Sequence, residues 1–281
     1  MADNLYVFSR DTPASVRLYF QHWMWRYQTG YLLHPNVVTT KEGLKIADIA
    51  CGTGIWLIEV ARSLSTSTQL DGFDISEDQF PDKGWLPKNV TLSSLDSLAP
   101  LPEHLIGKYD VVHIGLLVMI IKNENPVPLL KNVMAMLKPG GYVQWDEMDV
   151  GSLNPSFPDK SRPCPHYDAL HTQSTAFFDA RNLTYRWVSE LDKFFKQQGL
   201  DVLSYTRLPI HDDLAKPWTE MQLMATWDVN EKVLVPAALK DPSASPSAKE
   251  WRQMYGKVVE EVNQGMSIRM DMIVVVGKKG S

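Results

Sequence analysis

Between residues 45 and 149, the pattern of hydrophobic and polar positions switches repeatedly between two periods. Short apolar runs that end at turn residues predict buried strands, and the longer segments between them carry apolar residues at helical spacing. Strands are predicted over Lys45–Ala50, Gln69–Asp74, Val90–Ser93, Tyr109–Ile114 and Tyr142–Asp149, and helices over Gly54–Ser65 and Pro128–Leu137. This alternation predicts a parallel sheet covered by helices, and therefore an α/β fold.

The segments on either side of this core carry different patterns. Aromatic and aliphatic residues recur at helical spacing from Ala14 to Leu33, which predicts a helix that caps the ligand-binding edge of the sheet. Four prolines between Pro155 and Pro165 predict a loop, which the amphipathic stretch Tyr167–Arg181 completes as a lid. Further along, the sequence predicts a helix over Tyr185–Gln198 and a closing pair of strands over Asp201–Leu208 and Ile268–Lys278.

A second insertion separates the two closing strands. It holds Trp218, Met221, Met224 and Trp227, which either line an apolar pocket or pack in the core. The run Asp241–Ser247 is rich in serine and proline and predicts an exposed loop. With 281 residues, 44% of them hydrophobic, the chain is expected to form one domain, with an N-terminal cap (1–40), a core (41–149), a lid (150–184) and closing strands (185–281) that enclose the insertion 209–265.

Net charge and cysteine content narrow the classes of function. A formal charge of −5 and the lack of a Lys/Arg-rich arm argue against nucleic acid as a partner. The first ten residues lack the apolar core of a signal peptide, and no later run is long enough to span a bilayer, so a cytoplasmic protein without a membrane partner is expected. Cys51 and Cys164 are the only cysteines, too few for a disulfide scaffold, and they form no metal-ligand pattern.

A glycine-rich turn directly follows the first predicted strand. The run Asp48-Ile49-Ala50-Cys51-Gly52-Thr53-Gly54 lets the backbone turn tightly at its two glycines and approach a ligand closely. Asp74, 22 positions after Gly52, ends the next predicted strand, where an acid of a doubly wound sheet accepts hydrogen bonds from ribose hydroxyls. Because Ile55-Trp56-Leu57 follows in place of a third glycine, the turn does not match a dinucleotide fingerprint.

The same run resembles the acidic glycine-rich motif of class I S-adenosylmethionine-dependent methyltransferases, with Ala50 in place of the first glycine. Further landmarks of that family follow in order, namely Leu95-Asp96, Tyr109-Asp110-Val111-Val112 and Leu137-Lys138-Pro139-Gly140-Gly141-Tyr142. Three other runs, Arg17–His22, Thr29–Pro35 and Gly141–Glu147, look like a subgroup of fungal methyltransferases of secondary metabolism. The resemblance implies a Rossmann-like fold with a seven-stranded, mostly parallel sheet, and S-adenosyl-L-methionine as the cofactor.

The resemblance also implies roles for individual residues. Asp48 is expected to hold the methionine end of the cofactor, Asp74 the ribose, and Asp96 the adenine amine, with Leu95 packed nearby. His113, at the ligand end of the fourth strand, either touches a ligand or is a hydrogen-bonded core histidine. The complete predicted cofactor set is Gln21, Asp48, Ala50, Cys51, Gly52, Gly54, Asp74, Ile75, Leu95, Asp96 and His113.

Candidate acid–base groups follow from their position near the predicted ligand edge. The predicted catalytic set is His22 in the cap helix, Asp146 and Glu147 at the end of the fifth strand, and His166 on the lid. His171 on the lid and His211 after the sixth strand are further candidates. Each also has a purely structural interpretation as a solvated or hydrogen-bonded side chain. Because an activated methyl group needs chiefly alignment and exclusion of water, a strong base is optional.

We therefore expect a methyltransferase that acts on a small molecule, with oxygen as the preferred acceptor atom, followed by nitrogen and then carbon. That order comes from the frequency of each acceptor in the family. Two alternatives share the same cofactor motifs. In one, the bound cofactor acts as a fixed positive charge while the enzyme directs a dehydration or a pericyclic ring closure. In the other, the chain is a methyltransferase-like regulator that acts through protein partners.

Overall fold

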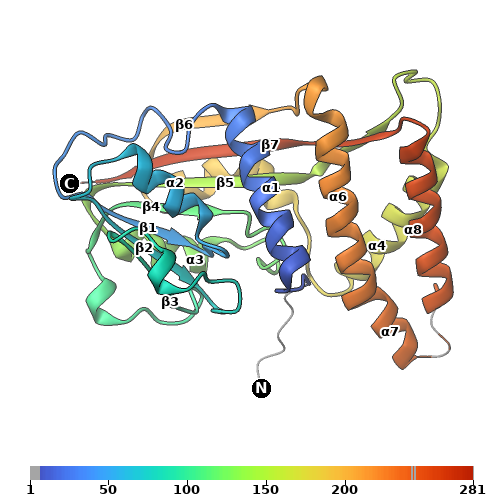
Figure 1. The fold of residues 1–281 in the computed structure, drawn as a ribbon, viewed down its shortest axis with the longest axis horizontal. Coiled ribbons are helices and arrows are strands. Elements are labelled where there is room, and N and C mark those ends of the chain that lie inside the picture. The colour runs from blue at the N-terminus through green and yellow to red at the C-terminus, as the bar shows by residue number, and fades with distance from the viewer. Residues whose placement is uncertain (1–6, 242, 244, 281) are drawn as a thin grey trace.

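The computed structural model describes residues 7–241, 243 and 245–280. Within these residues, a sheet of seven strands has the order β3-β2-β1-β4-β5-β7-β6 (Figure 1). The strands are β1 (Lys45–Ile49), β2 (Gln69–Asp74), β3 (Val90–Ser94), β4 (Tyr109–Gly115), β5 (Leu137–Ser156), β6 (Leu200–Leu208) and β7 (Ser267–Lys279). Neighbours from β3 to β5 are parallel, and β7 runs antiparallel to both β5 and β6. The predicted α/β fold with a mostly parallel sheet is confirmed.

The strand order determines where a ligand can bind. β1 pairs with β2 on one side and with β4 on the other, so the direction of winding reverses at β1. In open α/β sheets, ligands bind beyond the carboxyl ends of the strands at such a switch point. The glycine-rich turn that follows β1 lies at this point.

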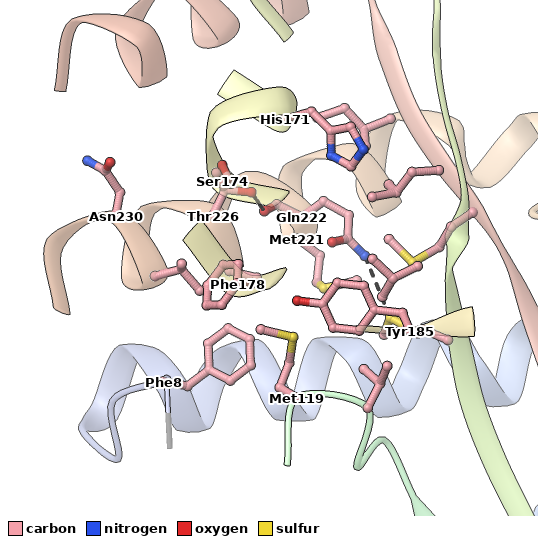
Figure 2. Close-up of a pocket in the computed structure, with 18 of the residues that line it drawn as sticks. Phe8, Met119, His171, Ser174, Phe178, Tyr185, Met221, Gln222, Thr226 and Asn230 are labelled. Atoms are coloured by element: carbon pink, nitrogen blue, oxygen red, sulfur yellow. Dashed lines mark hydrogen bonds between the residues drawn. The ribbon is translucent and has the colours of Figure 1, made fainter. Parts of the chain in front are cut away.

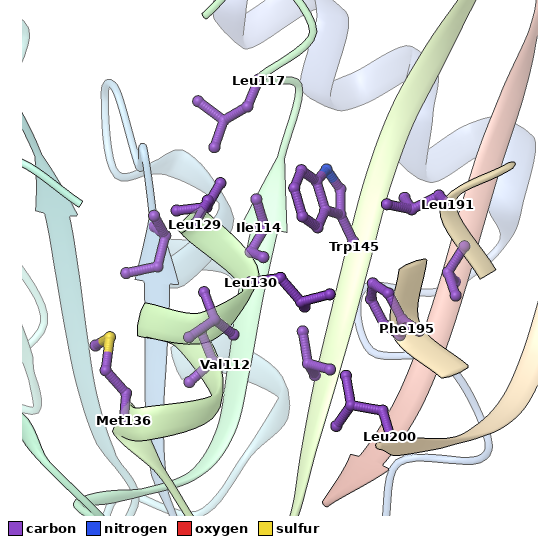
Figure 3. Packing of buried hydrophobic residues seen from close by; sticks show 14 of the residues in the cluster. Val112, Ile114, Leu117, Leu129, Leu130, Met136, Trp145, Leu191, Phe195 and Leu200 are labelled. Atoms are coloured by element: carbon purple, nitrogen blue, oxygen red, sulfur yellow. The ribbon is translucent and has the colours of Figure 1, made fainter. Parts of the chain in front are cut away.

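Helices cover both faces of the sheet. On one face lie α1 (Thr12–Thr29), α2 (Ile55–Ser63) and α6 (Ala215–Val229), whose buried side chains share one apolar cluster with β1, β2 and β7. On the other face, α3 (Val127–Met136), the 3-10 turn Arg186–Glu190 and α5 (Leu191–Gln197) pack around Trp145 and Phe195 (Figure 3). Because β1 and β4 are covered on both faces, they form nearly continuous apolar runs in the sequence.

A third apolar cluster lies beyond the end of the sheet. There α4 (Pro165–Asp179), α7 (Val235–Lys240) and α8 (Ala248–Asn263) pack together, on the side of the molecule away from β1 to β3 (Figure 1). Further 3-10 turns cover Lys83–Trp85, Glu103–Leu105 and Asp212–Leu214, and a π-helical turn, Asn230–Leu234, joins α6 to α7. The predicted lid and the second insertion thus contribute to one helical layer.

The end of β5 differs most from its prediction. The sequence predicted a strand end at Asp149 and a proline-rich loop after it, but β5 continues to Ser156 and pairs Pro155 with Ile268 of β7. A register shift between Asp149 and Asn154 interrupts the ladder. β4 has already ended at Gly115, so the outer edge of β5 is unpaired there and tolerates a proline without a backbone N–H.

Two smaller differences concern the closing part of the chain. The single helix predicted over residues 185–198 is a 3-10 turn followed by the short helix α5. Of the predicted loop Asp241–Ser247, Pro242 and Ala244 lie outside the described residues, and Ser247 forms a capping box with Glu250 at the start of α8.

Across the described ranges, no helix combines the length and the apolar character needed to span a membrane. In the same part of the chain, no group of three or more His, Cys, Asp or Glu side chains is arranged to hold a metal ion.

Candidate functional site

The turn after β1 lines a cavity of about 210 Å³ at the carboxyl edge of the sheet, which we call the cofactor cavity. Gly52 and Gly54 have φ angles of 52° and 71°, in the left-handed region that favours glycine. A Cβ atom on Gly52 would lie 3.2 Å from Leu18 of α1, and one on Gly54 would lie 2.7 Å from Leu92. The turn therefore requires glycine both for its backbone angles and for the space around it.

Ala50 shares this left-handed conformation, with a φ angle of 58°. It is the position at which the methyltransferase motif has its first glycine. A residue with a Cβ costs roughly 1 kcal/mol in this region. The tight turn is thus retained at a small cost in stability.

Two carboxylates at the ends of neighbouring strands face the cofactor cavity. Asp74 accepts hydrogen bonds from the backbone N–H groups of Gly52 at 2.9 Å and Ser76 at 3.2 Å. Asp96, just after β3, accepts one from the backbone N–H of Leu98 at 3.0 Å. Since a carboxylate has about four lone-pair sites, each has capacity left to accept from a hydroxyl or amine of a ligand.

Three buried ionisable side chains from adjacent strands form part of the same wall. His113 of β4 contacts Asp48 of β1 through Nδ1 at 2.7 Å and Asp146 of β5 through Nε2 at 3.3 Å. Its ring stacks on the indole of Trp56 in α2, with the ring centroids 3.9 Å apart. Gln144 donates to both oxygens of Asp146, at 3.1 Å and 3.2 Å.

The charge of this cluster follows from its contacts. Burial alone would lower the pKa of His113, but the charges and hydrogen bonds of Asp48 and Asp146 outweigh burial and raise the pKa to about 9. His113 is therefore an imidazolium held by Asp48 and Asp146. Burial raises the pKa of Asp48, and the charge and hydrogen bond of His113 lower it. The carboxyl oxygens of the two acids offer acceptors to donor groups of a ligand in the cavity.

The structure brings most of the predicted cofactor residues together. Ten of the eleven line the cofactor cavity, namely Gln21, Asp48, Ala50, Cys51, Gly52, Asp74, Ile75, Leu95, Asp96 and His113. Gly54 does not line it, and acts instead through the conformation of the turn. His113 combines both of its predicted interpretations, because it is a hydrogen-bonded core histidine that also faces the cavity.

His22 also lines the cofactor cavity, but its ring is already engaged. Its Nε2 atom lies 2.7 Å from a carboxylate oxygen of Glu59 in α2, and Arg26 forms an ion pair with the same carboxylate. Burial lowers the pKa of His22 to about 4, against the opposing charge of Asp48, so the imidazole is neutral at pH 7. This geometry does not support the predicted role of His22 as a base toward the acceptor.

Glu147 faces the opposite side of the sheet from Asp146, because neighbouring residues of a strand point to opposite faces. Its carboxylate accepts hydrogen bonds from the backbone N–H of Leu117 at 2.8 Å, from that of Met148 at 3.1 Å and from the indole N–H of Trp145 at 3.2 Å. Burial raises the pKa of Glu147 to about 7, although these hydrogen bonds lower it. Glu147 lines neither cavity described here, so this geometry does not support its predicted catalytic role. Its hydrogen bond to Leu117 holds the segment after β4 in place.

The histidines of the lid and of the second insertion separate in the structure. His166 is exposed on α4 and lies against α8, outside both cavities, so this position does not support its predicted catalytic role. His171, further along the same helix, lines a second cavity, and burial lowers its pKa, which leaves it neutral at pH 7. His211 precedes the 3-10 turn Asp212–Leu214 and lines neither cavity.

This second cavity, of about 230 Å³, adjoins the first, and we call it the acceptor cavity (Figure 2). The two cavities share four lining residues, Leu18 and Gln21 of α1 and Leu116 and Ile120 after β4. Most of the remaining lining is apolar, including Phe8, Met119, Met148, Val150, Leu170, Phe178, Met221 and Met270. Among the described residues, no Asp, Glu or Lys lines the acceptor cavity, and Arg17 is its one permanently charged side chain.

Sequence reasoning anticipated little of the acceptor cavity. Of the four large residues singled out in the second insertion, Met221 lines it and Trp218 is buried in the core, whereas Met224 and Trp227 are partly exposed. Tyr185 and Gln222 were missed altogether. They belong to different segments that meet only in the folded chain, so no local pattern marks them.

Comparison with known proteins was made on the whole chain. Residues 47–143 match a family model described as a methyltransferase domain. A Penicillium methyltransferase named grgD is 40% identical over 113 residues, which cover 38% of this chain and 39% of the relative. An N-methyltransferase named verN from Clonostachys rogersoniana is 31% identical over 150 residues, which cover 53% of this chain and 52% of the relative. The matched part thus spans about half of these relatives or less.

Among solved structures, phosphoethanolamine N-methyltransferase 2 of Haemonchus contortus, in complex with S-adenosyl-L-methionine, matches with a TM-score of 0.51. The match has 13% sequence identity and covers 95% of this chain and 57% of that chain, so it bears on the fold alone. Residues 47–143 thus match a methyltransferase domain, and the chain is similar in sequence to fungal methyltransferases. Its fold is similar to that of a solved methyltransferase in complex with S-adenosyl-L-methionine.

Proposed function

We propose that the chain is an S-adenosyl-L-methionine-dependent methyltransferase that transfers the methyl group to a small molecule bound in the acceptor cavity. The observation that carries this proposal is the pair of adjoining cavities. One has the glycine-rich turn and strand-end carboxylates of a cofactor site, and the other is largely apolar. Their shared wall would bring donor and acceptor into contact, which is the main requirement of methyl transfer.

The residues of the cofactor cavity fit the proposed cofactor. Asp74 would accept from the ribose hydroxyls and Asp96 from the adenine amine, since each carboxylate retains capacity as an acceptor. The carboxyl oxygens of Asp48 and Asp146 would accept hydrogen bonds from the amino group at the methionine end. When bound, the cofactor supplies a methyl group that its sulfonium charge has already activated.

We propose a neutral nitrogen as the acceptor atom, in place of the oxygen expected from the sequence. An alcohol needs a base to become a strong nucleophile, whereas an uncharged amine attacks through its lone pair. No carboxylate lines the described part of the acceptor cavity, and His22 and Glu147 are engaged elsewhere. His171 remains available to take the proton that a methylated nitrogen releases. The name of the relative verN, an N-methyltransferase, supports the same choice.

The test is transfer of isotopically labelled methyl from S-adenosyl-L-methionine into a small-molecule extract of the organism that carries the gene. Boiled protein and Asp74→Ala serve as negative controls, and Asp78→Ala, an exposed acid nearby, as the matched variant. We expect a labelled product that is lost in both negative controls and retained with Asp78→Ala. Mass spectrometry and NMR then identify the methylated atom. Tight cofactor binding without any labelled product would contradict methyl transfer and favour a cyclase or a regulator.

A further inference from the structure

We infer that the acceptor cavity takes an uncharged, largely apolar ring molecule that presents a carbonyl-type oxygen to the hydroxyl of Tyr185. This inference names the ligand class of the proposed function, and it rests on that function where it treats the ligand as the methyl acceptor. The binding site itself is defined by the cavity and is testable without methyl transfer.

The first observation is the position of Tyr185. It directly precedes the 3-10 turn Arg186–Glu190 and packs against the apolar cluster around Trp145, which fixes the base of its ring. Its ring projects among the other side chains of the acceptor cavity, and its hydroxyl points inward (Figure 2). Among the described residues, the hydroxyl has no hydrogen-bond partner.

The Tyr185 hydroxyl is a hydrogen-bond donor that a ligand oxygen can use. Burial, together with the charge of Asp179, raises the pKa of Tyr185 far above its usual value, so the O–H bond stays intact at any working pH. A ligand that fills the cavity would exclude water from this hydroxyl, which is costly unless an oxygen of the ligand accepts its hydrogen bond. Tyr185 is therefore suited to hold a ligand and unsuited to act as a base.

The remaining lining limits the charge of the ligand. No carboxylate in the described part of the chain lines the acceptor cavity, so an ammonium group would have no counterion there. The hydroxyls of Ser174 and Thr226 donate hydrogen bonds to backbone carbonyl oxygens of their own helices. Arg17, the one permanently charged side chain of the lining, donates to Gln21 at 3.4 Å and lies over the ring of Phe8. The inward-facing hydroxyl of Tyr185 is thus one donor that the cavity offers to a neutral ligand, beside the imidazole of His171.

The apolar lining also determines the general shape of the ligand. Phe8 and Phe178 lie together on one side of the cavity, and the flexible side chains of Met119 and Met221 lie next to them (Figure 2). Aromatic rings offer flat surfaces for a ring molecule, and methionine adapts to irregular outlines. A cavity of about 230 Å³ has room for a small molecule of about two fused rings, and it lies just below the range of about 300–1,000 Å³ that is usual for ligand pockets.

The test uses two probes that differ by one carbonyl group, 1-tetralone and tetralin. Their binding is measured by equilibrium dialysis in the presence of S-adenosylhomocysteine, which confines the probes to the acceptor cavity. One net hydrogen bond corresponds to roughly a 3- to 10-fold tighter binding of 1-tetralone by the unmodified protein. We expect Tyr185→Phe to remove this preference and to leave the affinity for tetralin unchanged.

Tyr205→Phe is the matched control, because Tyr205 lies on β6 outside both cavities and donates to the backbone carbonyl of Ser189 at 3.1 Å. It should retain the preference for 1-tetralone. Since the Tyr185 hydroxyl has no partner to lose within the described residues, Tyr185→Phe should unfold at the same temperature as the unmodified protein in the absence of ligand. Equal binding of the two probes, binding of neither, or a preference that survives in Tyr185→Phe would each overturn the inference. Failure of labelled methyl transfer would overturn the proposed function instead, and leaves the dialysis result as it stands.

Discussion

The cofactor cavity and the acceptor cavity lie side by side, but they are built in different ways. The first is lined largely by residues at the carboxyl ends of the parallel strands β1, β2 and β4, together with α1. The second is lined by segments from Phe8 to Met270 that come from three α-helices, the π-helical turn, two strands and three loops. A cavity at the switch point of a sheet takes its geometry from strand order, whereas a cavity between packed helices depends on contacts that no single segment encodes.

The charged cluster of the cofactor cavity gives the largest expected effect. The folded-state pKa of His113 is raised to about 9, above its unfolded value near 6.5, so the stabilisation is complete below pH 6.5 and disappears as the pH rises through 9. For His113→Gln we expect a loss of roughly 3 kcal/mol in the free energy of unfolding at pH 6, shrinking toward pH 9. Urea denaturation at a series of pH values measures this difference.

His104→Gln is the control for that series, because His104 is exposed on the 3-10 turn Glu103–Leu105. It should leave the curve unchanged. A constant difference between His113→Gln and the unmodified protein over pH 6 to 9 would show that the Asp48–His113–Asp146 cluster is not charged in the way described.

A substitution of Asp74 tests the cofactor cavity separately from the acceptor cavity. Asp74→Asn removes a charged acceptor from the cofactor cavity and leaves the acceptor cavity intact. We expect the affinity for S-adenosylhomocysteine, measured by calorimetry, to fall roughly 10- to 100-fold. The affinity for 1-tetralone should not change. Asp78→Asn should behave as the unmodified protein, and an equal loss in both variants would refute a specific role for Asp74.

Glu147 tests whether a buried acid next to the site acts on structure or on chemistry. Glu147→Gln keeps one acceptor oxygen, but turns an amide N–H toward backbone donors, so we expect a loss of about 1–3 kcal/mol in the free energy of unfolding at pH 8. Cofactor affinity should stay within about threefold, since Glu147 lines neither cavity. Unchanged stability combined with lost methyl transfer would restore the catalytic assignment. The exposed Glu77→Gln is the control.

Ala50 gives the smallest expected effect. Ala50→Gly relieves the left-handed backbone, and we expect a gain of about 0.5–1 kcal/mol in the free energy of unfolding, or about 2 °C in melting temperature. Ala61→Gly, inside α2, should change stability in the opposite direction because glycine weakens a helix. A loss of stability in Ala50→Gly would show that the alanine methyl group contributes packing that outweighs its strain.

The fold and most of the cofactor cavity could be predicted from the sequence because both depend on local signals. The glycine turn, Asp74 and Asp96 each follow a predicted strand, and the topology of a parallel sheet brings strand ends to one edge. The predicted catalytic set is divided by the fold for an equally physical reason. Asp146 and Glu147 are neighbours on one strand, and only the register of β5 decides which of them faces the cavity.

The lining of the acceptor cavity could not be predicted from the sequence, for a different reason. His166 and His171 lie on one helix, and which of them faces inward depends on how α4 packs. Gln222 lies on α6 and Tyr185 directly precedes the 3-10 turn Arg186–Glu190, so they line one cavity only in the folded chain, and neither lies in a motif. The proline rule also failed at Pro155, because pairing with β7 outweighs a local preference for a loop.

The long pairing of β5 with β7 has a mechanical consequence. This two-stranded ribbon contributes Asp146 to the cofactor cavity, and Met148, Ile268 and Met270 to the acceptor cavity. α4 and α6 line the acceptor cavity alone. Because the same pair of strands holds residues of both cavities, the spacing between cofactor and acceptor in the proposed reaction follows from the pairing of β5 with β7 and needs no movement of one domain toward another.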